Sequence, residues 1–218
     1  FGGFLMFWIL QGDKVIVGSF YGMEQLGLYT IVFTCLMLPC MIVHRIANAL
    51  ALPILGASYY AEKHFKAQCQ MLFALVLAVT TVALMGFIYL GPWLLIFAFS
   101  ESFLQSLVFL PWIAAMACIR LLRVVPSVIT LAMAQPHCEL LANLARCLAI
   151  PLALVFISLD LPAISIAVAA FLGETLALIV AVATIKTPFP LWRLALHGRG
   201  PVLALSILAI GILLLQPW

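Results

Sequence analysis

Long uninterrupted runs of apolar residues dominate the sequence, and they decide what the chain can fold into. Of its 218 residues, 67% are hydrophobic and only 8% are charged, whereas soluble domains carry about 25% charged residues. Such a chain cannot cover a water-exposed surface, and it is too apolar to be disordered. The runs are continuous and about twice as long as a β-barrel strand. We therefore predict an all-α polytopic membrane protein.

Seven stretches have the roughly 20 apolar residues that a helix needs to cross the hydrocarbon core. They are predicted at residues 1–21, 27–55, 70–90, 104–133, 139–158, 162–185 and 201–217. Helix-ending residues separate them, as at Gly91-Pro92, because proline cannot donate to the helical hydrogen-bond ladder. The chain opens at Phe1 inside an apolar run, so we expect the first span to be truncated and further sequence to precede it.

Basic residues outside the spans fall on alternate loops. The loops after the second, fourth and sixth spans share one side and hold Lys63, Lys66, Lys186, Arg193 and Arg199. The loops on the other side hold no Lys or Arg. The positive-inside rule therefore places the basic loops in the cytoplasm. Residues 186–200 are either an interfacial segment, with Trp192 in lipid and arginines at headgroups, or a plain basic loop.

Charged residues inside the predicted spans are the strongest functional signal, because a charge in the bilayer is costly. Five are basic and two are acidic: Lys14, Arg45, Arg120, Arg123, Arg146, Asp13 and Glu174. Arg120 and Arg123 are three residues apart, so they share one helix face. They lie too deep for easy snorkelling, and Pro126 follows them. This pair is predicted to line a polar cavity.

The other intramembrane charges leave alternatives open. Asp13 and Lys14 either line the cavity or form a local polar break, and Arg45 lines it or snorkels to headgroups. Arg146 shares a helix face with Asn143. Glu174 is either a buried partner for one of the arginines or a protonatable coupling site.

The charge balance of these residues predicts the class of ligand. If they share one lumen, it has an excess of about three positive charges, which attracts an anion in low-dielectric surroundings. Arginine suits phosphate or carboxylate through its planar fork of donors. Most of the cations lie from mid-membrane toward the cytoplasm, which favours an anionic headgroup taken from the cytoplasmic leaflet.

Motifs for other chemistry are missing from the sequence. It contains no Walker loop, no HExxH, no Cys-x-x-Cys pair and no nucleophile elbow. The six cysteines are interpreted as small apolar side chains, and the stretch from Gln135 to Glu139 as a loop and helix start. We expect no enzyme activity, no cofactor, no metal and no nucleic-acid partner.

Residues 12–33 read GDKVIVGSFYGMEQLGLYTIVF, with the pair Asp13-Lys14, then Gly18, Gly22 and the run Leu26-Gly27-Leu28-Tyr29. Farther along come ITLAMAQPHCELLANLARCLAIPLAL and a small-residue span that contains Glu174. In their order and spacing these features resemble the second half of bacterial polysaccharide-export flippases of the multidrug/oligosaccharidyl-lipid/polysaccharide superfamily. The resemblance covers about residues 5–185. Pro162 departs from it, because the family tends to have glycine in that turn.

The resemblance implies two six-helix bundles around a lumen that works by alternating access. Residues 1–185 would form the second bundle, residues 186–200 a cytoplasmic loop and residues 201–218 an additional transmembrane helix. The partners implied are an undecaprenyl-diphosphate-linked oligosaccharide, the lipid bilayer of the bacterial cytoplasmic (inner) membrane, and the missing N-terminal half of the same chain. The family's lumen cations would correspond to Lys14, Arg45, Arg120, Arg123 and Arg146.

Two rival functions remain at this point. A cation-coupled drug exporter of the same superfamily would need an acidic or apolar cavity, which the basic excess argues against. A membrane-embedded polysaccharide polymerase would need an external loop or a clustered acid/base pair, and neither is visible in the sequence.

Overall fold

The described part of the chain consists of helices. The computed structural model describes residues 2–93, 97 and 101–185. Its labelled elements are α1 (Gly2–Phe20), α2 (Gly22–Ser58), α3 (Glu62–Tyr89), the 3₁₀ helix η1 (Glu101–Phe109), α5 (Leu110–Ala132), α6 (Pro136–Cys147), α7 (Ala149–Ser158) and α8 (Ile164–Thr184). No strand occurs among these residues. The prediction of an all-α polytopic membrane protein is confirmed.

Five of the described helical stretches are long and apolar enough to cross a membrane. They are Gly22–Ser58, Lys63–Phe87, Gln105–Ala132, Pro136–Ser158 and Ile164–Thr184, and they correspond to the second through sixth predicted spans. The first predicted span forms α1, which is not among the five. Its polar run from Gln11 to Lys14 lowers its hydropathy. The expected basic loop at 186–200 and the span at 201–217 lie outside the described residues.

The second and third spans are longer than predicted and form a tight hairpin. We expected a loop over residues 56–69, but α2 ends at Ser58 and α3 begins at Glu62. The Ser58 hydroxyl hydrogen-bonds the Gln68 side chain across the turn, and Phe65 is buried. Loss of apolar character was mistaken for the end of a helix, whereas the helix continues with one polar face. The 37 residues of α2 extend about 55 Å, well beyond the hydrocarbon core.

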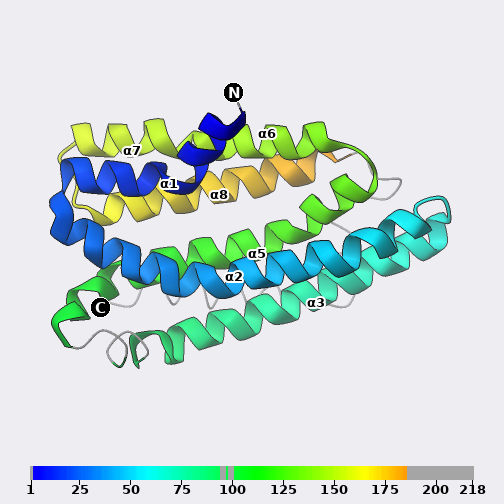
Figure 1. Cartoon of the computed structure of the whole chain (residues 1–218), viewed down its shortest axis with the longest axis horizontal. Helices are drawn as coiled ribbons and strands as arrows, with labels where there is room; N and C mark the ends of the chain where they lie inside the picture. The colour runs from blue at the N-terminus through cyan, green and yellow to red at the C-terminus, as the bar shows by residue number, and fades with distance from the viewer. Residues whose placement is uncertain (1, 94–96, 98–100, 186–218) are drawn as a thin grey trace.

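The fifth span is divided at Leu148, which separates α6 from α7. The sequence predicted one helix over 139–158, so this break is a correction. Pro151 accounts for it, because proline lacks an N–H and its ring clashes with the carbonyl four residues earlier, that of Cys147. The two short helices stay roughly in line along the top of the bundle in Figure 1.

Successive turns lie at opposite ends of the bundle. The α2–α3 and α5–α6 turns are at one end and the α1–α2 and α7–α8 turns at the other (Figure 1). This alternation is the one that the orientation argument requires. Helix α5 is central: it packs against α2 and α3 on one side and against α8 on the other, so it touches most of the bundle.

Candidate functional site

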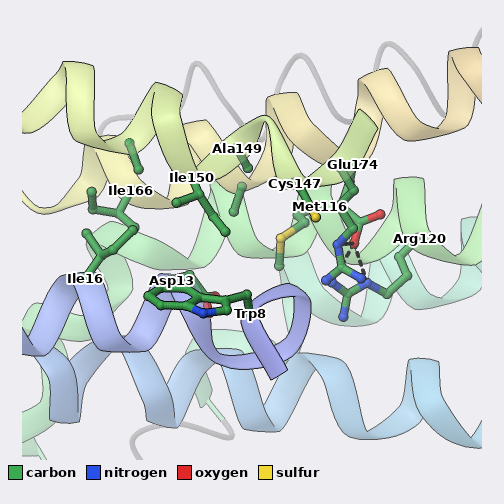
Figure 2. Close-up of a pocket in the computed structure, with 13 residues that line it drawn as sticks. Trp8, Asp13, Ile16, Met116, Arg120, Cys147, Ala149, Ile150, Ile166 and Glu174 are labelled. Carbon is green, nitrogen blue, oxygen red and sulfur yellow. Dashed lines mark hydrogen bonds and ion pairs between the residues drawn. The ribbon is translucent and has the colours of Figure 1, made fainter. Parts of the chain in front are cut away.

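Glu174, in the middle of α8, is the centre of an ion-pair cluster. Its side chain is 1% exposed. Its Oε1 accepts hydrogen bonds from Nε and Nη2 of Arg120 on α5, at 2.8 and 2.5 Å. Nε of Arg146 on α6 lies 2.9 Å from the same oxygen. Figure 2 shows Arg120 and Glu174 pointing toward one another across the space between their helices. Three helices therefore meet at one carboxylate.

A glycine makes this meeting possible. Gly173 precedes Glu174, and a Cβ added to it would lie 2.6 Å from the Cβ of Ala149 and 3.0 Å from the carbonyl oxygen of Arg146. Only a residue without a side chain lets α8 approach the α6–α7 junction this closely. Leu148, which separates α6 from α7, directly precedes Ala149. The close approach brings Arg146 to Glu174.

Arg123, one turn along α5 from Arg120, lies between two carboxylates. Its Nε is 3.9 Å from Oε2 of Glu174, and its Nη2 is 3.9 Å from Oε1 of Glu139 on α6. Its Nη1 donates a hydrogen bond to Oδ1 of Asn143 at 3.2 Å. Glu139 in turn accepts a hydrogen bond from the Ser127 hydroxyl at 2.7 Å. Arg123 thus connects the Glu174 cluster with a second polar cluster around Glu139.

Asp13 and Lys14 take different directions from α1. The hydroxyl of Tyr29, a fully buried residue of α2, donates a 2.6 Å hydrogen bond to Oδ2 of Asp13. The Lys14 ammonium hydrogen-bonds the side chain of Gln11 at 3.1 Å and lies 4.5 Å from the ring centre of Phe33. Asp13 therefore joins α1 to α2, and Lys14 is held by neutral and aromatic groups.

A pocket with a cavity volume of about 40 Å³ brings these groups together. Its polar lining comes from Asp13, Arg120, Arg146 and Glu174. The apolar remainder includes Trp8 and Met116, and Figure 2 shows Trp8 and Asp13 on α1 across from Ala149 and Ile150 of α7. Charged groups from four helices thus line a cavity between apolar walls.

Arg45 does not join the cluster. It is exposed on α2, and no ion pair is found for it among the described residues. Its neighbour His44, also exposed, is close enough to interact electrostatically with Arg123 and Glu139. Adjacent positions of a helix point about 100° apart. Arg45 therefore faces a different direction from His44.

The net charge of the cluster is lower than the sequence suggested. Arg45 and Lys14 lie outside it and Glu139 lies inside it. Three cations therefore face three carboxylates among the described residues: Arg120, Arg123 and Arg146 against Asp13, Glu139 and Glu174. The expected excess of about three positive charges is not found in this cluster, whose charges balance. The arginines nevertheless retain spare donors. Among the described residues, Arg146 reaches a carboxylate through Nε only, and Nη1 of Arg120 faces the sulfur of Met37 at 3.1 Å, a weak acceptor.

Glu139, Ser127 and Tyr29 were missed as site residues. Glu139 was interpreted as a loop and helix start, although it is four residues from Asn143 and seven from Arg146. That spacing puts all three on one helix face and could have revealed it. Ser127 likewise follows Arg123 by four residues. No signal of this kind marks Tyr29, whose role depends on how α1 folds back along α2.

The arrangement can bind an anion. Guanidinium groups with unused donors, set in a low-dielectric bundle, bind phosphate or carboxylate oxygens strongly. In the described part of the chain no group of three or more His, Cys, Asp or Glu could hold a metal ion.

The comparison with protein families gives a match to the first part of the chain. Residues 1–108 match a family described as polysaccharide biosynthesis protein, which confirms, over this part of the chain, the resemblance found in the sequence. No curated protein and no solved structure gives a significant match.

Proposed function

We propose that this multi-pass membrane chain, whose first 108 residues match a family described as polysaccharide biosynthesis protein, belongs to a flippase for a lipid-linked oligosaccharide. The flippase would move the anionic repeat unit of a surface polysaccharide from the cytoplasmic to the outer leaflet of the bacterial inner membrane. The family match and the five apolar helices support a role in polysaccharide biosynthesis at a membrane. The flipping activity, its direction and its substrate are the proposal.

The observation that carries the proposal is the arginine cluster at the centre of the bundle. Three arginines meet one carboxylate, Glu174, halfway along α8. A buried charge is costly unless it is paired, so a chain that keeps three arginines there has a use for them. The diphosphate of a polyprenyl-linked sugar offers the oxygens that such guanidinium groups bind. This function needs a lumen and asks for no catalysis or cofactor.

The described chain would supply one side of that lumen. In the proposed mechanism it forms one bundle of an alternating-access transporter, and the N-terminal half of the same protein forms the other. Asp13, Arg120 and Arg146 line the pocket from α1, α5 and α6, and charged ligands gain most from such fixed groups where water is scarce. The sugar would then extend along the lumen while the prenyl chain stays in lipid.

Neutralising the arginines in the full-length protein tests the proposal. The double variant Arg120→Gln with Arg146→Gln should lower surface polysaccharide at least about tenfold, because each lost charge-assisted bond contributes on the order of 1.5–3 kcal/mol. Membrane insertion, measured by quantitative immunoblotting of membranes, should stay near the wild-type level. Lys63→Gln is the matched control, since Lys63 is exposed at the start of α3 and should leave export unchanged.

A second variant guards against loss of folding. Arg146→Lys keeps the positive charge but removes the planar fork of donors, so export should fall less than in the double variant while the protein remains inserted. Normal surface polysaccharide in the inserted double variant would contradict the proposal. Drug resistance without a polysaccharide defect would point to the exporter, and altered polymer length with normal translocation to the polymerase.

A further inference from the structure

The two oxygens of Glu174 have very different surroundings. Oε1 faces three arginine nitrogens within 2.9 Å, two from Arg120 and one from Arg146. Oε2 is buried and has no hydrogen bond among the described residues. The nearest arginine nitrogen to it in an ion pair is Nε of Arg123, at 3.9 Å. Oε1 of the carboxylate therefore pairs with Arg120 and Arg146, whereas Oε2 lies on the side of Arg123.

We infer that Glu174 determines the ligand specificity of the arginine site: it occupies Arg120 and Arg146 as a built-in anion and yields only to a ligand with two adjacent negative charges. On binding, Glu174 turns onto Arg123, and the ligand takes the donors that Glu174 leaves. This inference rests on the proposed function, because it assumes that an anionic lipid enters the pocket.

The charge requirement follows from what displacement costs. A ligand that enters must replace the hydrogen bonds made by Oε1 and must compensate both arginines. A phosphodiester brings one negative charge, so it can at best exchange for Glu174, which already supplies one. A diphosphate diester brings two, one for Arg120 and one for Arg146. Charge-assisted bonds left unmade in a buried site cost more than in water, so the doubly charged ligand is strongly favoured.

Arg123 is the residue that makes the exchange possible. Without a new partner, the displaced carboxylate would be a buried and unpaired charge, which is strongly destabilising. Arg123 is 11% exposed and lies 3.9 Å from both Glu174 and Glu139, with one hydrogen bond to Asn143. It is close enough to pair with Glu174 after a small side-chain movement, and it makes no short ion pair elsewhere within the described part of the chain. Glu139 keeps its own bond to Ser127.

The test compares two lipids that differ in one phosphate. The full-length protein in nanodiscs is titrated with a polyprenyl diphosphate sugar and with the polyprenyl monophosphate sugar of the same chain and sugar. The wild type should bind the diphosphate form at least about tenfold more tightly, since one unreplaced charge-assisted bond is worth about that factor. Glu174→Gln should bind the monophosphate form more tightly than the wild type does, and the ratio of the two affinities should fall toward one.

Glu24→Gln is the matched control. Glu24 is an exposed carboxylate in the first turn of α2 and does not line the pocket, so its neutralisation should leave the ratio of affinities at the wild-type value. A general loss of folding would lower both affinities and leave their ratio unchanged, so the ratio separates specificity from structure. If Glu174→Gln does not fold, Glu174→Asp serves, because a carboxylate shortened by one methylene should hold Arg120 and Arg146 less well and reduce the ratio.

Two results would overturn the inference. If Glu174→Gln or Glu174→Asp keeps the wild-type ratio while binding either lipid, Glu174 does not set specificity, although the proposed flippase function stands. If the wild-type protein binds neither lipid, both the inference and the proposed function fail.

Discussion

Helix α5 packs against two different kinds of neighbour. Toward α6 and α8 it presents Arg120 and Arg123, which meet carboxylates at the centre of the bundle. Toward the α2–α3 hairpin it presents Val124 and Val128, which pack in an apolar cluster with Phe65. One helix of 23 residues thus has a charged side and an apolar side within the same membrane span.

The difference shows what each side contributes. Inside a membrane, apolar helices gain little from leaving lipid, so the hairpin side is held by close packing. The charged side cannot be held that way, because removing one member of a buried ion pair strands the other. We therefore expect the hairpin side to determine stability and the charged side to determine ligand binding. Substitutions on the two sides should separate these properties.

The largest effect is expected from Phe65→Ala, which removes a buried ring from the apolar cluster between α5 and the α2–α3 hairpin. Phe65 is 1% exposed and its ring lies 5.7 Å from that of Tyr59. Truncation should lower the free energy of unfolding by about 3 kcal/mol, since buried Phe→Ala changes cost about 3–5 kcal/mol. Unfolding of the full-length protein in mixed micelles, titrated with SDS, measures this. Lipid binding by the folded fraction should be unchanged. Weakened binding would contradict the expectation that the hairpin side determines stability and the charged side determines ligand binding.

Gly173→Ala is expected to have the next largest effect, and it should lower both stability and ligand binding. The new Cβ would overlap Ala149 and crowd the carbonyl of Arg146, so α8 must move away from the α6–α7 junction. Overpacking of this kind costs about 1–3 kcal/mol. The movement also separates Arg146 from Glu174, so binding of the polyprenyl diphosphate sugar should weaken. The same SDS titration and nanodisc binding assay measure the two effects.

Gly86→Ala is the control for this prediction. Gly86 also lies inside a helix, α3, but a Cβ there would meet nothing within 4 Å. Alanine should therefore leave stability unchanged or raise it by about 0.5–1 kcal/mol, the usual gain over glycine in a helix. If both substitutions behave alike, the close approach at Gly173 is not what positions Arg146.

The sequence predicted the helices well because each apolar run is long and the turns contain Gly, Pro or polar residues. The sequence did not predict correctly those helix boundaries that depend on more than hydropathy. The α2–α3 turn lies at Tyr59–Ala61, inside a stretch interpreted as a loop, because an exposed helix end can be polar. The division at Leu148 depends on Pro151, whose effect on a span varies with its neighbours.

The candidate site was predictable only in part. The spacing of Arg120 and Arg123 put them on one face. Glu174 was expected either as a buried partner for one of the arginines or as a protonatable coupling site, and it is paired with arginines in the structure. Which arginines share that acid depends on the distance between α6 and α8, which Gly173 sets and no local pattern reveals. Glu139 was discarded because it sits beside a turn, although its spacing from Asn143 and Arg146 was informative.

The smallest effect is expected for Arg45→Gln, and it sharpens the comparison because the sequence left open whether Arg45 lines the cavity with Arg120 or snorkels to headgroups. Arg45 is exposed and has no ion pair among the described residues, so its loss strands no carboxylate there. Export should stay within about twofold of wild type and the unfolding free energy within about 0.5 kcal/mol, as for surface substitutions. Surface polysaccharide and the SDS titration of the full-length protein measure these. A loss of export as large as that of the Arg120 and Arg146 double variant would mean that ligand contacts extend along α2, and that the cluster around Glu174 is only one part of the binding surface.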